Sequence, residues 1–174
     1  MDDSFFAYLQ QLELIAFFSG YPLIYALVVV FAGNQDEKNK FKTRITSLLP
    51  FAYALVGTLF LGFQLKKLYP DYSFEHLKLT MQQPWLIIWG LLSLLFWIPA
   101  IAKKRVLSLI HSFVFFFFLA KDLFVKLFFP SMNNGVLRND MHLYTSSLLL
   151  NLGAFAFIVF IHFLLTRYKN RLRP

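Results

Sequence analysis

Five long runs of apolar residues divide this chain, and short polar or charged segments separate them. The runs cover residues 14–33, 45–65, 85–102, 106–129 and 143–166. Each is close to the ~20 residues that an α-helix needs to cross a hydrocarbon core about 30 Å thick. Unpaired backbone groups are costly in lipid, and the runs are too long for barrel strands. The pattern therefore predicts an all-α polytopic membrane protein, a single domain over residues 1–174 with about five transmembrane helices.

The first run is interrupted by the sequence Ser-Gly-Tyr-Pro at residues 19–22. Proline inside a helix removes a backbone hydrogen bond, and sharp helix kinks usually occur at such residues. We expect a kink there, or a helix that begins only after Pro22. Pro84 falls near the start of the third run, where a missing N–H costs little, and Pro130 follows the end of the fourth.

The basic residues between the runs predict the orientation of the chain in the membrane. Four of them lie in 34–44, three in 103–105 and four in the C-terminal tail, which makes eleven. In a chain that spans the membrane five times, these three segments lie on the same side of the membrane. The opposite side holds Lys66, Lys67, Lys78 and Arg138. Lysine and arginine are enriched in cytoplasmic loops. The sequence therefore predicts an N-terminus outside the cytoplasm and a cytoplasmic C-terminus.

Composition agrees with a membrane location and limits the possible chemistry. Hydrophobic residues make up 58% of the chain, and 23 phenylalanines are too many for a soluble core of this size to hide. The net charge of +8 comes from clusters beside the apolar runs. Such clusters favour anionic lipids at the cytoplasmic face as partners, and no nucleic acid. The absence of cysteine excludes disulfides and thiolate metal sites. We expect location in a plasma membrane or a bacterial inner membrane.

The fourth run contains three charged residues, Lys121, Asp122 and Lys126. Charged groups within a span are functional candidates by default. His111, Phe115, Phe118 and Asp122 share one helical face, so Asp122, Lys121 and His111 are candidates for a proton or ion pathway. The alternative is structural: the lysines reach the head groups, and Asp122 pairs with Lys126 four residues later. These charges also leave open whether this run crosses the membrane fully.

Two histidines form the second candidate site. His111 lies six residues after Arg105, and His162 lies five residues before Arg167, so antiparallel spans would place both imidazoles at similar depth. Two facing histidines are able to ligate a b-type haem or to serve a quinone site. A histidine bonded to a neighbouring helix is the more common arrangement. We therefore predict no cofactor and retain haem as an alternative, with no metal site.

Small and polar residues indicate where the helices pack. Ala54, Thr58 and Gly62 recur at four-residue intervals, a pattern that permits close helix contact. Asn151 belongs to a broad polar face of the fifth run. The chain has no nucleotide-binding loop, no zinc-protease motif and no hydrolase elbow.

These patterns favour a non-catalytic accessory or scaffolding subunit of a larger membrane complex, with other membrane subunits as partners, over an enzyme. The first alternative is a proton-coupled transporter or channel component that uses Asp122, Lys121 and His111. The second is a haem- or quinone-binding redox subunit that uses His111 and His162.

Overall fold

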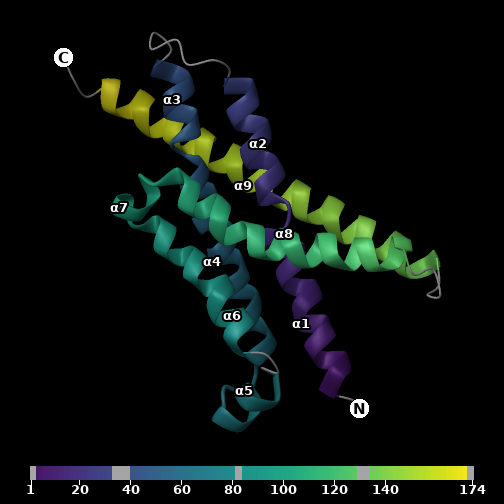
Figure 1. Ribbon diagram of the computed structural model, residues 1–174. Helices are drawn as coiled ribbons and strands as arrows, with labels where there is room; N and C mark the ends of the chain where they lie inside the picture. Colours follow the sequence, from purple (N-terminus) through teal and green to yellow (C-terminus); the bar gives the residue numbers. More distant parts are fainter. Residues whose placement is uncertain (1–2, 33–39, 81–83, 129–133, 172–174) are drawn as a thin grey trace.

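A computed structural model describes residues 3–32, 40–80, 84–128 and 134–171, and every regular element in those residues is a helix (Figure 1). The all-α prediction is confirmed. The elements are α1 (Asp3–Phe18), α2 (Tyr21–Ala32), α3 (Lys40–Thr46), α4 (Leu49–Leu68), α5 (Phe74–Thr80), α6 (Pro84–Leu91), the 3₁₀ helix η1 (Leu92–Trp97), α7 (Pro99–Ala102), α8 (Arg105–Phe128) and α9 (Asn134–Arg171).

Within the described residues, three helical segments are long enough and apolar enough to cross a membrane: Gln10–Phe31, Thr43–Leu68 and Met141–Lys169. The second and third of these contain the predicted spans 45–65 and 143–166, and the first covers the predicted span 14–33 as far as Phe31. The first of them is broken at Ser19 and Gly20, between α1 and α2, where the sequence predicts a kink. Three such helices are compatible with a membrane protein.

The third predicted span, 85–102, is not one continuous α-helix. The continuous apolar helix here runs over Pro84–Trp97, and η1 forms the second half of it. The Ser93 hydroxyl donates to the Gly90 carbonyl at 2.6 Å, a local bond that competes with regular α-helical pairing. Ile98 is extended, with ψ of 117°, because it precedes Pro99, and it separates η1 from α7.

The fourth predicted span, 106–129, corresponds to the 24-residue α8. Helix α9 has 38 residues and extends well beyond the predicted fifth span on its N-terminal side. Figure 1 shows α8 and α9 running obliquely across α1, α2 and α4 rather than alongside them. The helices therefore do not form the simple aligned bundle that five equal spans suggest.

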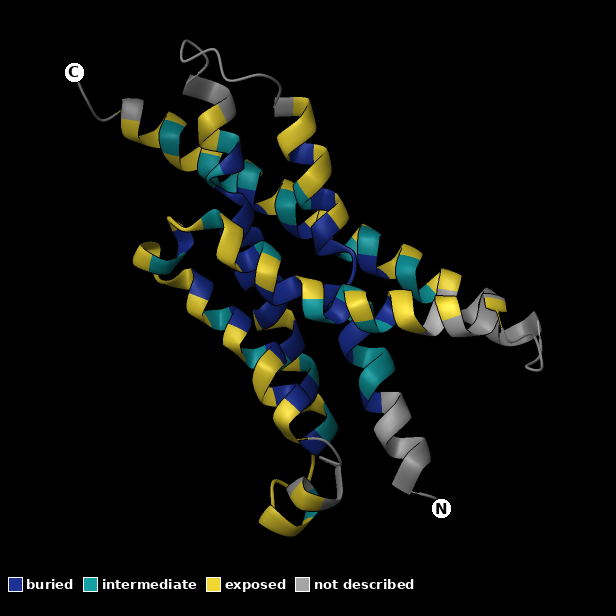
Figure 2. Ribbon diagram, in the orientation of Figure 1, coloured by how far each residue is buried: buried dark blue, intermediate teal, exposed yellow. Residues whose placement is uncertain are grey.

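The core lies where α8 and α9 cross α1, α2 and α4. Figure 2 shows it as a band of buried residues. Phe18 stacks on Phe115 with ring centroids 4.8 Å apart, and it meets Tyr53 and Phe60 edge-on. Large apolar side chains also cover much of the outside, and Phe31 on α2 is 79% exposed. An apolar exterior of this kind suits lipid as the surrounding solvent.

Candidate functional site

His111 of α8 is the most chemically versatile side chain in the core, and the protein binds both of its ring nitrogens. Nε2 lies 2.9 Å from the Trp89 carbonyl oxygen, and Nδ1 lies 2.7 Å from the Tyr53 hydroxyl. A carbonyl only accepts, so Nε2 carries a proton and donates it. In the neutral imidazole, Nδ1 then accepts from Tyr53. His111 thereby connects α8 to α4 and α6.

Aromatic rings enclose this imidazole. The Trp89 ring lies parallel to it, with an interplanar angle of 7° and centroids 4.9 Å apart. Tyr53, Phe96 and Phe115 meet it edge-on at 5.6–6.1 Å. His111 is therefore held in one orientation by packing as well as by hydrogen bonds.

A second chain of hydroxyl groups lies beside the first. The Ser108 hydroxyl donates to the Arg105 carbonyl at 2.7 Å, so the Tyr21 hydroxyl, 2.8 Å away, is the donor to Ser108. The Arg105 guanidinium in turn donates to Thr46, which joins the start of α8 to the end of α3. The rings of Tyr21 and Tyr53 are in contact, with centroids 4.4 Å apart.

The break between α1 and α2 forms another polar centre, and α9 supplies its hydrogen-bond partners. The Gly20 N–H donates to the Ser147 hydroxyl at 2.9 Å, and the Asn151 amide donates to the Phe17 carbonyl at 2.8 Å. Ser147 and Asn151 are four residues apart, on one face of α9. Together they provide an acceptor and a donor for backbone groups at the helix break.

The orientation of the Asn151 amide follows from its partners. Its nitrogen faces two carbonyl oxygens, those of Phe17 and Ser147, both at 2.8 Å. Only the NH₂ group is able to donate to both. The oxygen Oδ1 is buried without a hydrogen-bond partner, as is His162 Nε2.

Two of the predicted pathway residues, Lys121 and His111, lie apart along α8. Lys121 is exposed, whereas His111 is buried in the core about 15 Å earlier along α8. The side chain of Asp122 lies outside the described residues. His162 is half-buried on α9, and its Thr166 neighbour bonds the His162 carbonyl. Among the described residues, no group of three or more histidine, cysteine or acidic side chains is placed to hold a metal.

The small residues of α4 have different surroundings. Ala54 is fully buried, and Thr58 accepts from the Trp97 indole at 2.9 Å, but Gly62 has open space where a Cβ would lie. A close helix contact of α4 instead involves Gly57, where an added Cβ would lie 3.0 Å from Ser93 Cβ and closer still to its hydroxyl. Asn151 packs at the helix break described above.

Three residues with partners in the core were not predicted from the sequence: Trp89, Ser93 and Ser108. Ser108 and His111 are three residues apart on one helical face, which is the signal that points to a shared polar face on α8. No sequence signal points to the Trp89 carbonyl as a hydrogen-bond acceptor, because every residue has a backbone carbonyl.

Comparisons with protein-family models, with curated proteins and with solved structures found no match for this chain. Over the part of the chain that the structure describes, the fold is all-helical, with three membrane-compatible helices and a core joined by interhelical hydrogen bonds.

Proposed function

We propose that this chain is a non-catalytic accessory or scaffolding subunit of a membrane complex. In this proposal the chain crosses the bilayer five times, with its N-terminus outside and its C-terminus in the cytoplasm. The positive residues beside the apolar segments support that orientation. The oblique α8 and the short Pro84–Trp97 helix would then be strongly tilted or shallow spans.

The observation that carries the proposal is how the core uses its polar groups. Both nitrogens of His111 bond to neighbouring helices, and Ser147 and Asn151 bond the break in the first helical segment. A catalytic group needs access to a substrate, whereas these groups bind other parts of the same chain. Their arrangement stabilises helix crossings, and polar side chains in membrane bundles commonly have that role.

The apolar exterior supports a partner as well as lipid. Phe160 on α9 and Phe31 on α2 are 58% and 79% exposed. Neighbouring membrane helices pack against such surfaces by van der Waals contact.

Photo-crosslinking in native membranes tests this proposal. A benzophenone amino acid at Phe160 or Phe31 should join the chain to the same second polypeptide, in a fixed ratio across preparations. The same group at the fully buried Phe115 serves as the control and should give no such product. If both exposed positions yield only lipid adducts, and the purified protein is a lone chain, the subunit proposal is wrong.

A second candidate function is proton handling, and the two adjacent hydrogen-bond chains favour it. Tyr53 and His111 form one chain and Tyr21 and Ser108 the other, with the two tyrosine rings in contact. Proteoliposomes with an imposed pH gradient would show a flux that His111→Gln and Tyr53→Phe both reduce. A flux equal to that of empty liposomes rejects this candidate.

The haem alternative has weaker support, because axial ligation would require His111 to give up one of its two hydrogen bonds. A Soret band in the purified protein that His111→Ala removes would restore that alternative.

A further inference from the structure

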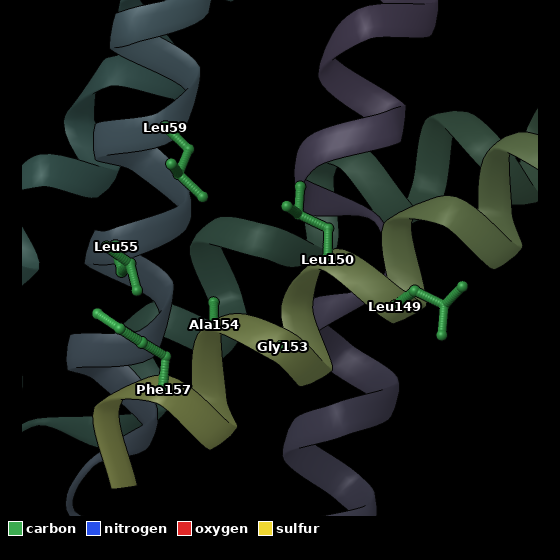
Figure 3. Close-up of a pocket in the computed structure, with 7 residues that line it drawn as sticks. All are labelled: Leu55, Leu59, Leu149, Leu150, Gly153, Ala154 and Phe157. Carbon is green, nitrogen blue, oxygen red and sulfur yellow. The ribbon is translucent and has the colours of Figure 1, made fainter. Parts of the chain in front are cut away.

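An open apolar groove lies between α4 and α9. Its volume is about 410 Å³, and Figure 3 shows Leu55 and Leu59 of α4 directed toward Ala154 and Phe157 of α9. Gly153 leaves the groove open, because a Cβ there would meet open space beyond the backbone of its own helix. The remaining lining residues are Leu149 and Leu150.

The groove leads toward the strongly basic end of the molecule. Leu48, Ala52 and Ile158 form a buried cluster that joins the start of α4 to α9 beyond the groove. The bond between Arg105 and Thr46 brings the start of α8 to the same end. The exposed basic residues of these segments are Arg44, Lys103, Lys104, Arg167, Lys169 and Arg171.

Acidic residues are few at this end. No aspartate or glutamate occurs in 40–48, 98–108 or 158–171, and the sequence places only Asp36 and Glu37 in the preceding connection, beside Lys38. A concentration of positive charge of this kind attracts anionic lipid head groups.

The distance between the groove and the basic end suits one lipid molecule. Phe157 precedes Arg167 by ten residues, which is about 15 Å along α9. One leaflet contributes about half of the ~30 Å hydrocarbon core. The groove therefore lies within the length that one acyl chain spans when the lipid phosphate is at the basic end.

We propose that the α4–α9 groove and the basic end together form a binding site for an anionic glycerophospholipid of the cytoplasmic leaflet. One acyl chain lies in the groove against Gly153, and the phosphate pairs with the basic residues at the C-terminal end of α9. The inference rests on the proposed orientation in the membrane. Acyl chains cover any exposed apolar helix, so the distinctive properties of this site are retention of the lipid and selectivity for its head group.

The experiment uses the full chain in nanodiscs of equimolar phosphatidylglycerol and phosphatidylcholine, followed by gentle detergent extraction and native mass spectrometry. The wild-type protein should retain phosphatidylglycerol over phosphatidylcholine by at least about tenfold, as several basic contacts imply. Gly153→Leu fills the groove and should lower that retention about tenfold, since it removes acyl-chain contacts. Gly62→Leu is the matched control, because Gly62 also faces open space but lies outside the groove.

The basic end is tested separately. Replacing Arg167, Lys169 and Arg171 by glutamine should remove the preference for phosphatidylglycerol and leave phosphatidylcholine bound. Lys66→Gln with Lys78→Gln, at the predicted outer side, should leave the preference unchanged. Inorganic phosphate at the concentration of the lipid should not displace phosphatidylglycerol, since it has no acyl chain to occupy the groove. Competition by phosphate would assign the basic end to a free anion and overturn the lipid site.

Two further results would overturn the proposal. One is equal retention of both lipids by the wild type, and the other is a Gly153→Leu protein that binds like the wild type. Loss of a dimer in Gly153→Leu would assign the groove to a second copy of the chain. Reporter fusions at residue 174 check the orientation independently, and the crosslinks at Phe160 and Phe31 check the subunit proposal. A failure of the lipid site is therefore distinguished from a failure of the orientation or of the subunit proposal.

Discussion

The hydroxyl oxygen of Ser147 accepts the backbone N–H of Gly20 at 2.9 Å, although 127 positions separate the two residues in the sequence. Gly20 lies at the break between α1 and α2, where regular helical bonding stops. An added Cβ at Gly20 would lie 2.7 Å from the backbone of Ser147 and Leu148. The absence of a side chain thus permits the close approach of α9 that brings the hydroxyl within bonding distance.

Removing the Ser147 hydroxyl should destabilise the protein. Ser147→Ala leaves the Gly20 N–H buried without its partner, and we expect a loss of about 1 kcal/mol, in the range for interhelical hydrogen bonds in membranes. The free energy of unfolding would be measured by SDS titration in mixed micelles. Ser146→Ala is the control, because Ser146 is exposed on the same helix. Equal effects of the two changes would contradict the assigned role.

A methyl group at Gly20 should have a larger effect, because the clash is with backbone atoms and not with a side chain that is able to rotate. Gly20→Ala should lower the unfolding free energy by about 2 kcal/mol or more, the cost typical of forced overpacking. Gly62→Ala should be neutral or slightly stabilising, since it adds helix propensity in open space. A tolerated Gly20→Ala would show that α9 does not approach the break so closely.

The contact between Gly57 and Ser93 predicts a suppressor pair. Gly57→Ala should destabilise the crossing of α4 and η1, because its Cβ meets the Ser93 side chain. Ser93→Gly removes both clashing atoms, so the double variant should recover part of the loss. A double-mutant cycle on unfolding free energies measures this coupling. Strict additivity of the two changes would mean that the residues do not touch.

Topology is the fourth prediction. Reporter fusions at residues 75 and 135 should report the exterior, and fusions at 40 and 174 the cytoplasm, since eleven basic residues against four favour that orientation. A cytoplasmic signal at 135 alone would mean that α8 does not cross the membrane. The oblique direction of α8 in Figure 1 makes this the most informative fusion.

The packing residues of α4 were only partly predictable from the sequence. Ala54, Thr58 and Gly62 recur every four residues, and that spacing indicates a helix face but not the height at which a neighbour crosses it. The close contact of α4 falls at Gly57, next to Thr58 but on a different face. The same holds for His111, whose depth can be estimated from the sequence, whereas its bonds to Tyr53 and Trp89 depend on how α8 crosses α4 and α6.

The sequence by itself determined that this chain is helical and apolar enough for a membrane, because long apolar runs in lipid must satisfy their backbone hydrogen bonds within each segment. It also located the break at 19–22, since proline and glycine act on their own part of the backbone. Tertiary structure decided that the third run divides into α and 3₁₀ pieces and that α8 and α9 cross the other helices. It also decided which polar groups form hydrogen bonds with one another. Contacts between residues far apart in the sequence depend on helix crossing angles and side-chain volumes, and a local sequence pattern specifies neither.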